Sequence, residues 1–229
     1  MELAGLITLG ILPSLVWIFF YLQEDIHPEP KRMLLFVFAA GALVTFFVVG
    51  AENYFHRNIL PSSLQPYHPL SLLGLAFIEE AFKFLIVFLA VRKSKAFDEP
   101  IDAMIYMITG ALGFAAVENV GAIVGGHALM SGALEITILR FIGATLLHSL
   151  TAGLAGYYWA VGILRQKVWR YIAFGIAAAT ILHMVFNYLI LRFDPEIYPT
   201  LFLAVFAFFI LGDFEKLKNG IAHQTQSTS

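Results

Sequence analysis

Seven long apolar runs determine what this chain of 229 residues can fold into. They cover residues 3–22, 33–51, 70–91, 101–125, 138–163, 171–192 and 198–214. Each run approaches or exceeds the roughly 20 residues that a helix needs to cross the hydrocarbon core of a bilayer, and the last run is the shortest. Membrane β-barrels instead show strands of alternating polarity. The sequence therefore predicts an all-α, polytopic membrane helix bundle with about seven transmembrane helices.

The composition agrees with a membrane location and excludes several classes of site. Only 13% of the residues are charged, against about 25% in a soluble domain. The net charge is −2 and there is no basic tract, which argues against nucleic acid as a partner. The chain has no cysteine, so disulfides, thiolate nucleophiles and cysteine-bound metals are excluded.

Basic residues alternate between successive connections. Ten of the fourteen Lys and Arg residues lie in the segments that follow the first, third, fifth and seventh runs. By the positive-inside rule, the N-terminus lies outside and the C-terminus inside. We expect a single transmembrane domain over residues 1–219 and a disordered cytoplasmic tail over residues 220–229.

A few ionisable side chains lie well inside the runs, where each charge costs roughly 3 kcal/mol on insertion scales. They are Glu79, Glu80, Lys83, Glu118, His148 and His183. At about 1.5 Å per helical residue, Glu79, Glu118 and both histidines fall roughly 10–15 Å below the outer surface. Small residues surround these positions on three of the helices and allow close packing. The polar groups are therefore expected to meet inside the bundle at one depth.

Two histidines and several carboxylates at one depth are typical of a zinc hydrolase. Catalytic zinc takes three protein ligands of this type and a water molecule. The ligand candidates are Glu118, His148 and His183, and Glu79 or Glu80 is the general base that activates the water. The same groups are also compatible with activation of water by a glutamate without a metal.

Three further polar residues support this set or flank it. Lys83 follows Glu79 by one helical turn and can keep a carboxylate ionised. Asn187, and likewise Asn119, can polarise a carbonyl group or orient a ligand. Arg140 lies near a helix end, where we expect it to be an interfacial anchor.

Other functions remain open on these residues. Glu79, Glu80 and Lys83 could form a buried ion pair that only fixes helix packing. Intramembrane glutamates and histidines also serve as proton relays in transporters and channels. A non-catalytic binding or immunity protein on the same scaffold is the third alternative.

Short motifs in this chain resemble those of the PrsW-type intramembrane proteases, which are distantly related to CAAX prenyl endopeptidases and bacteriocin-immunity membrane proteins. The motifs are Glu79-Glu80-Ala-Phe-Lys83 (EExxK), Phe114-Ala-Ala-Val-Glu118-Asn119 (FxxxEN), His148 followed by Ser-Leu-Thr-Ala-Gly, and His183-Met-Val-Phe-Asn187 (HxxxN). Asp25-Ile-His-Pro-Glu-Pro30 resembles the acidic PEP element after the first helix. The resemblance covers the first six runs.

The resemblance implies a multi-pass peptidase of the bacterial plasma membrane. Characterised relatives make the first cut in a membrane-anchored anti-sigma factor, so it implies a membrane-anchored protein substrate cut near its extracytoplasmic end. The family is usually called a metalloprotease, which makes zinc the expected cofactor. The CAAX-processing relatives are argued to work without a metal, and they carry a histidine where this chain has Glu118. We expect a cavity among the third to sixth helices that brings water to the site.

Overall fold

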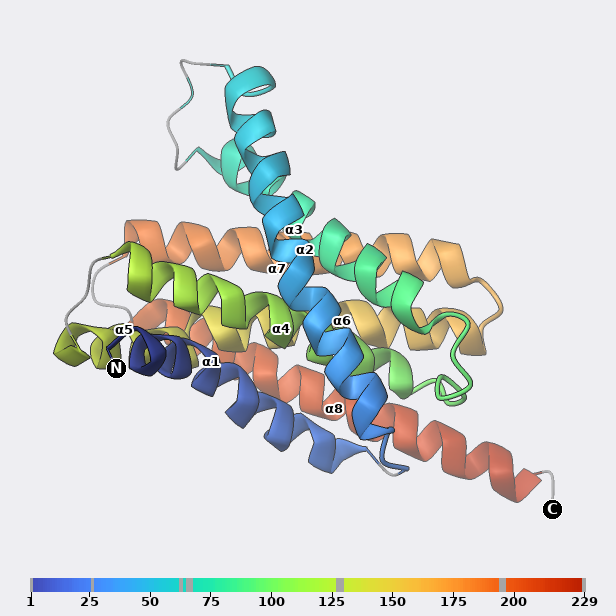
Figure 1. Cartoon of the computed structure of the whole chain (residues 1–229). Helices are drawn as coiled ribbons and strands as arrows, with labels where there is room; N and C mark the ends of the chain where they lie inside the picture. Colours follow the sequence, from blue (N-terminus) through green and yellow to red (C-terminus); the bar gives the residue numbers. More distant parts are fainter. Residues whose placement is uncertain are drawn as a thin grey trace.

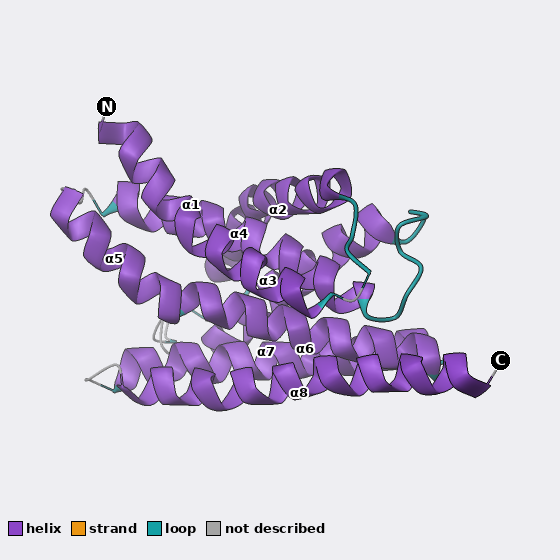
Figure 2. Cartoon of the chain, turned by 90° about the horizontal axis from the view of Figure 1, so that it is seen from below, coloured by secondary structure: helices purple, strands orange, loops and turns teal. Residues whose placement is uncertain are grey.

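The computed structural model describes residues 2–25, 27–61, 64, 68–126, 130–193 and 197–227, and all regular secondary structure in this part of the chain is helical (Figure 2). The elements are α1 (Glu2–Tyr21), the 3-10 turn η1 (Leu22–Glu24), α2 (Lys31–Asn58), α3 (Pro69–Val91), α4 (Asp102–Gly125), α5 (Met130–Ile142), α6 (Ala144–Leu164), α7 (Val168–Arg192) and α8 (Ile197–Ser227). The predicted all-α bundle is confirmed.

Six helical segments of the described chain are long and apolar enough to cross a membrane. They are Leu3–Glu24, Lys31–Asn58, Asp102–Gly125, Gly132–Leu164, Val168–Arg192 and Ile197–Asn219. Helix α3 also has a spanning length of 23 residues, but it carries three charged side chains near its middle. The structure is thus that of a polytopic membrane protein, and every predicted run corresponds to helix.

The fifth run contains a break that its hydropathy does not indicate. Gly143 has φ −103° and ψ −102°, and it separates α5 from α6. A Cβ atom at Gly143 would lie 2.8 Å from the carbonyl oxygen of Leu139, so only glycine fits there without a shift. The break places Arg140 in the last turn of α5 and His148 in the second turn of α6.

Helix α4 is the central element of the bundle. It packs against α1, α2 and α6 (Figure 1), and all of its residues from Asp102 to Ala116 are buried. A Cβ atom on Gly41 of α2 would lie 1.9 Å from the carbonyl oxygen of Gly110, so α2 and α4 are in backbone contact. Membrane helices approach this closely where small residues meet. Side chains on α4 therefore point directly at the neighbouring helices.

The hairpin of α2 and α3 leaves the bundle at its connecting end (Figure 1). The first half of α3 consequently diverges from α7, and an apolar groove of about 660 Å³ lies between the two helices. The groove is lined by Leu70, Leu73, Gly74, Phe77, Ala173, Ile176, Ala177, Thr180 and Ile181. It ends within about one helical turn of the polar residues near the middle of α3 and α7.

Helix α8 is longer than the apolar run that predicts it. Its backbone remains helical to Ser227, through residues that the sequence predicts to be a disordered tail. Once a helix is formed, each added residue gains a backbone hydrogen bond, so a spanning helix can continue past its apolar segment.

Candidate active site

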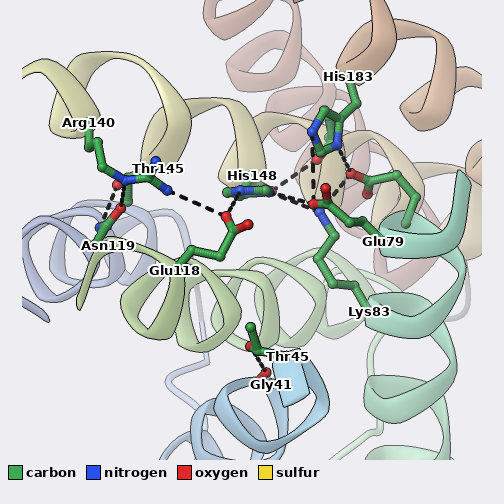
Figure 3. A network of polar contacts seen from close by, with 12 residues as sticks. Gly41, Thr45, Glu79, Lys83, Glu118, Asn119, Arg140, Thr145, His148 and His183 are labelled. Carbon is green, nitrogen blue, oxygen red and sulfur yellow. Dashed lines mark hydrogen bonds and ion pairs between the residues drawn. The ribbon is translucent and has the colours of Figure 1, made fainter. Parts of the chain in front are cut away.

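Glu79, His148 and His183 form a buried cluster from three separate helices, α3, α6 and α7 (Figure 3). Glu79 Oε2 lies 3.8 Å from His183 Nε2 and 4.0 Å from His148 Nδ1. One potential ligand atom from each residue lies within 4.8 Å of the other two. The depth predicted from the sequence therefore corresponds to spatial proximity for these three groups.

Glu80 binds the ring nitrogen of His183 that faces away from Glu79. Glu80 Oε1 lies 2.7 Å from His183 Nδ1 and accepts a hydrogen bond of 2.6 Å from Lys83 Nζ. Because an ionised carboxylate only accepts hydrogen bonds, Nδ1 carries the proton and Nε2 is left with a lone pair. His183 thus directs that lone pair towards Glu79.

Lys83 connects the two histidines. Its ammonium group is fully buried and lies 3.0 Å from His148 Nδ1 as well as bonding to Glu80. It also lies 5.2 Å from the ring centre of Phe114 on α4. The predicted role of Lys83 as the partner of a neighbouring carboxylate agrees with this contact, and the carboxylate is that of Glu80.

Glu118 approaches His148 from the opposite side. Its Oε2 atom lies 2.7 Å from His148 Nε2 and 3.5 Å from Arg140 Nη2. Glu118 is not part of the cluster in which Glu79 and the two histidines lie within 4.8 Å of one another. Its contact with this site passes through His148.

The predicted placement of Arg140 as an interfacial anchor is wrong. Arg140 Nε donates a hydrogen bond of 2.5 Å to Asn119 Oδ1, and Asn119 Nδ2 donates one of 2.9 Å to Thr145 Oγ1 (Figure 3). The break at Gly143 lets α5 approach α4 at this level, which hydropathy alone does not indicate. The partners of Asn119, which the sequence predicts to be a supporting residue, are therefore Arg140 and Thr145.

A polar cavity of about 130 Å³ lies in the middle of this network. Its walls are Glu79, Glu118, Arg140, Ala144, Leu147, His148, His183 and Asn187. The volume is sufficient for several water molecules, and the walls supply the polar partners that they need. The expected cavity among these helices is confirmed, and Asn187 borders it.

Glu52 is a site residue that the sequence reasoning missed. It lies directly after the predicted run of residues 33–51, whereas α2 continues as helix to Asn58. Its carboxyl group lies against that of Glu79 and interacts electrostatically with Glu118 and Lys83. The signal in the sequence is that Glu52 directly follows the run of residues 33–51, so a helix that continues past the run would include it.

The cluster of Glu79, His148 and His183 is compatible with a bound metal ion. Glu79 Oε2 is buried and has no hydrogen-bond partner among the described residues. Ligand atoms on one tetrahedral zinc ion lie roughly 3.4 Å apart. Glu79 Oε2 lies 3.8 Å from His183 Nε2 and 4.0 Å from His148 Nδ1, so a bound ion would draw these groups together and would replace the contact of His148 Nδ1 with Lys83 Nζ. With all carboxylates ionised, Glu52, Glu79, Glu80 and Glu118 carry four negative charges against the two positive charges of Lys83 and Arg140. A divalent ion would neutralise the difference of two charges.

A second polar cluster lies at the opposite end of α4, around the Asp25–Pro30 element. Tyr106 donates a hydrogen bond to Glu29, and His27 Nδ1 lies 2.7 Å from Glu99 Oε1. Burial raises the pKa of Glu29 from 4.5 to about 8, and the nearby Asp102 adds to this shift. Burial likewise raises the pKa of Asp25. This cluster fixes the α1–α2 connection to the start of α4, far along that helix from Glu118.

A bundle of spanning helices with a buried carboxylate–histidine cluster and a polar cavity is typical of a membrane-embedded hydrolase. The sequence model for the PrsW family intramembrane metalloproteases matches residues 29–212. The chain belongs to this family. It is thus an intramembrane protease of this family, and the matched region contains every predicted site residue.

Three relatives of similar length share the family name. The chain is 27% identical to Protease PrsW of Geobacillus kaustophilus, over 82% of this chain and 80% of the relative. It is 25% identical to Protease PrsW of Bacillus subtilis, over 88% and 90% of the two chains. The corresponding protein of Clostridioides difficile is 27% identical over 81% and 79%. No solved structure matches the chain.

Proposed function

We propose that this protein is an endopeptidase of the plasma membrane that cleaves a membrane-anchored protein, such as an anti-sigma factor, near its extracytoplasmic end. In this proposal the N-terminus lies outside and the C-terminus inside, so the cavity opens in the outer half of the bilayer. One observation carries the proposal: the unpartnered oxygen of Glu79 faces two histidines beside a cavity that is large enough for water.

The geometry favours an assignment of roles that differs from the one based on sequence. Glu79, His148 and His183 are the residues that would hold zinc, because they form the close group. Glu118 borders the cavity without belonging to that group, which suits a general base. Bound zinc would lower the pKa of a water molecule and polarise the substrate carbonyl. Glu80 and Lys83 orient His183 and are not part of the cavity wall.

The proton balance of hydrolysis can be met by residues of the cavity. The oxygen of a water molecule bonds to the carbonyl carbon, and Glu118 accepts the proton that this water loses. Glu118 then returns the proton to the amide nitrogen, which leaves as an amine when the C–N bond breaks. Asn187 borders the cavity and is the predicted amide donor to the carbonyl oxygen.

A proton-coupled transporter is the second candidate, because polar contacts run without a gap from α4 through α6 and α3 to α7. From Glu118 they pass through His148 and Lys83 to Glu80 and then to His183. Proton flux in liposomes that Glu79→Gln abolishes would support this candidate. A wild-type protein that cleaves substrate but carries no flux would exclude it.

Co-expression with epitope-tagged single-pass membrane proteins tests the proposal directly. We expect fragments that appear with the wild type and are absent with Glu79→Gln, and mass spectrometry of these fragments would locate the cut. Glu135→Gln is the matched control, since Glu135 is an exposed residue of α5. Equal fragment patterns for wild type and Glu79→Gln would contradict a role of this site in proteolysis.

Metal content separates the roles of the two cavity glutamates. In purified protein, Glu79→Gln is expected to lose both zinc and cleavage, because a ligand is removed. Glu118→Gln is expected to retain zinc and lose cleavage by about 10²–10⁴-fold, the usual contribution of a general base. The reverse pattern would favour Glu118 as the ligand and Glu79 as the base, which agrees with the sequence prediction of Glu79 or Glu80 as the base. A well-folded wild type without metal would favour a glutamate-activated water.

A further inference from the structure

Arg140 lies where two cavities meet. It lines the polar cavity of the candidate active site, and it also lines a second cavity of about 120 Å³ between the end of α5, α7 and the start of α8. Ala144 likewise borders both. The side chain of Arg140 is 24% exposed, so its guanidinium group is accessible to a molecule in these cavities.

The guanidinium group of Arg140 is held in place by Asn119, whose side chain is in turn held by Thr145. Arg140 Nε donates to Asn119 Oδ1, and the amide nitrogen of Asn119 donates to Thr145. Asn119 and Thr145 are both buried. These contacts join α4, α5 and α6, and they orient the guanidinium plane before any substrate is bound.

Arg140 also keeps unused hydrogen-bonding capacity. Its contact with Glu118 Oε2 is long, at 3.5 Å, and the same oxygen has a closer partner in His148 at 2.7 Å. No acceptor in the described part of the chain engages Arg140 Nη1. A guanidinium group presents five N–H donors in a rigid plane. Because these open donors face the polar cavity beside Glu118, they point to a bound acceptor.

We propose that Arg140 is a substrate-binding residue that donates hydrogen bonds from its Nη atoms to the carbonyl oxygen of the scissile peptide bond. This inference rests on the proposed peptidase function. When water adds to the carbonyl carbon, the electron pair of the C=O bond moves to oxygen and creates an oxyanion. The permanent charge of Arg140 stabilises that oxyanion. Glu118, which accepts the proton of the water, lies beside the same Nη2 atom.

Steady-state kinetics of Arg140→Ala test this assignment. The substrate is a quenched fluorescent peptide that spans the cleavage site mapped by co-expression. We expect kcat to fall by about 10²–10³-fold, as for the loss of one oxyanion donor, with KM changed only a few-fold. Metal content and Tm should stay close to those of the wild type. Added methylguanidinium should raise the kcat of Arg140→Ala at least tenfold, because it can occupy the space that the arginine side chain leaves.

Further variants separate substrate binding from a structural role. Arg140→Lys keeps the charge and is expected to retain more activity than Arg140→Ala, whereas Arg170→Ala removes an exposed arginine of α7 and should match the wild type. Loss of metal or of folding in both Arg140 variants, without rescue, would overturn the proposal in favour of a structural role. If the wild type is active and Arg140→Ala has the same kcat, the proposal for Arg140 is overturned and the proposed peptidase function is not affected. An inactive wild type would instead overturn the proposed function.

Discussion

Glu80 and His183 are joined by a 2.7 Å hydrogen bond between Oε1 and Nδ1, although 103 positions separate them in the chain. This contact fixes the tautomer and the direction of the His183 ring, so that Nε2 faces Glu79. Carboxylates that bind the far nitrogen of a metal-binding histidine commonly have this role. The two adjacent glutamates of α3 therefore serve different purposes, Glu80 as a positioning residue and Glu79 as a residue of the cavity.

Replacement of Glu80 by Gln should weaken metal binding by about 10–100-fold, the usual effect of losing such a positioning carboxylate. The amide cannot match the charge that holds Lys83 and orients His183. Zinc titration of the purified, metal-free variant measures the change, with Glu135→Gln as the control. Zinc affinity equal to that of the wild type would contradict the positioning role.

Replacement of Lys83 by Met should destabilise the protein by about 3–5 kcal/mol, because it leaves a buried carboxylate without its cation. The side chain of Lys83 is fully buried beside Glu80. Unfolding in detergent by denaturant measures this, and Lys93→Met serves as an exposed control. The double variant Lys83→Met/Glu80→Gln should be more stable than Lys83→Met alone. No recovery in the double variant would contradict the ion pair.

Replacement of Gly41 by Ala should destabilise the bundle by about 1–3 kcal/mol, the usual cost of overpacking. The added methyl group would collide with the backbone of Gly110, so α2 and α4 would have to separate. Gly50→Ala is the matched control on α2, because its Cβ atom would meet no atom within 4 Å. Equal thermal stability of the two variants would show that α2 and α4 are not in close contact.

Glu29 should make the stability of the fold depend on pH. Burial raises its pKa from 4.5 to about 8, so the folded state holds a proton that the unfolded state releases. Stability should therefore fall as the pH rises from about 4.5 to 8 and change little above that range. Glu29→Gln removes this contribution. The Tm difference between Glu29→Gln and wild type should grow with pH across this window, and a constant difference would contradict the shifted pKa.

Hydropathy and helical rise were sufficient to predict much of this protein. A bilayer allows a chain few ways to satisfy its backbone hydrogen bonds, so long apolar runs determined the helices. Counting residues along each run also placed Glu79, His148 and His183 at one level. Each of these results depends only on distance along a helix axis.

Only the tertiary structure decided which of these side chains meet and how. The rotation of each helix about its axis and the break at Gly143 are set by packing between helices, which distance along one helix does not determine. Packing directs Glu79 into the cavity and Glu80 towards His183. It also places Arg140 on the cavity and the carboxyl group of Glu52 beside that of Glu79. The sequence by itself thus determined that these groups share one level along the bundle, and the close contact of small residues in neighbouring helices decided how they meet.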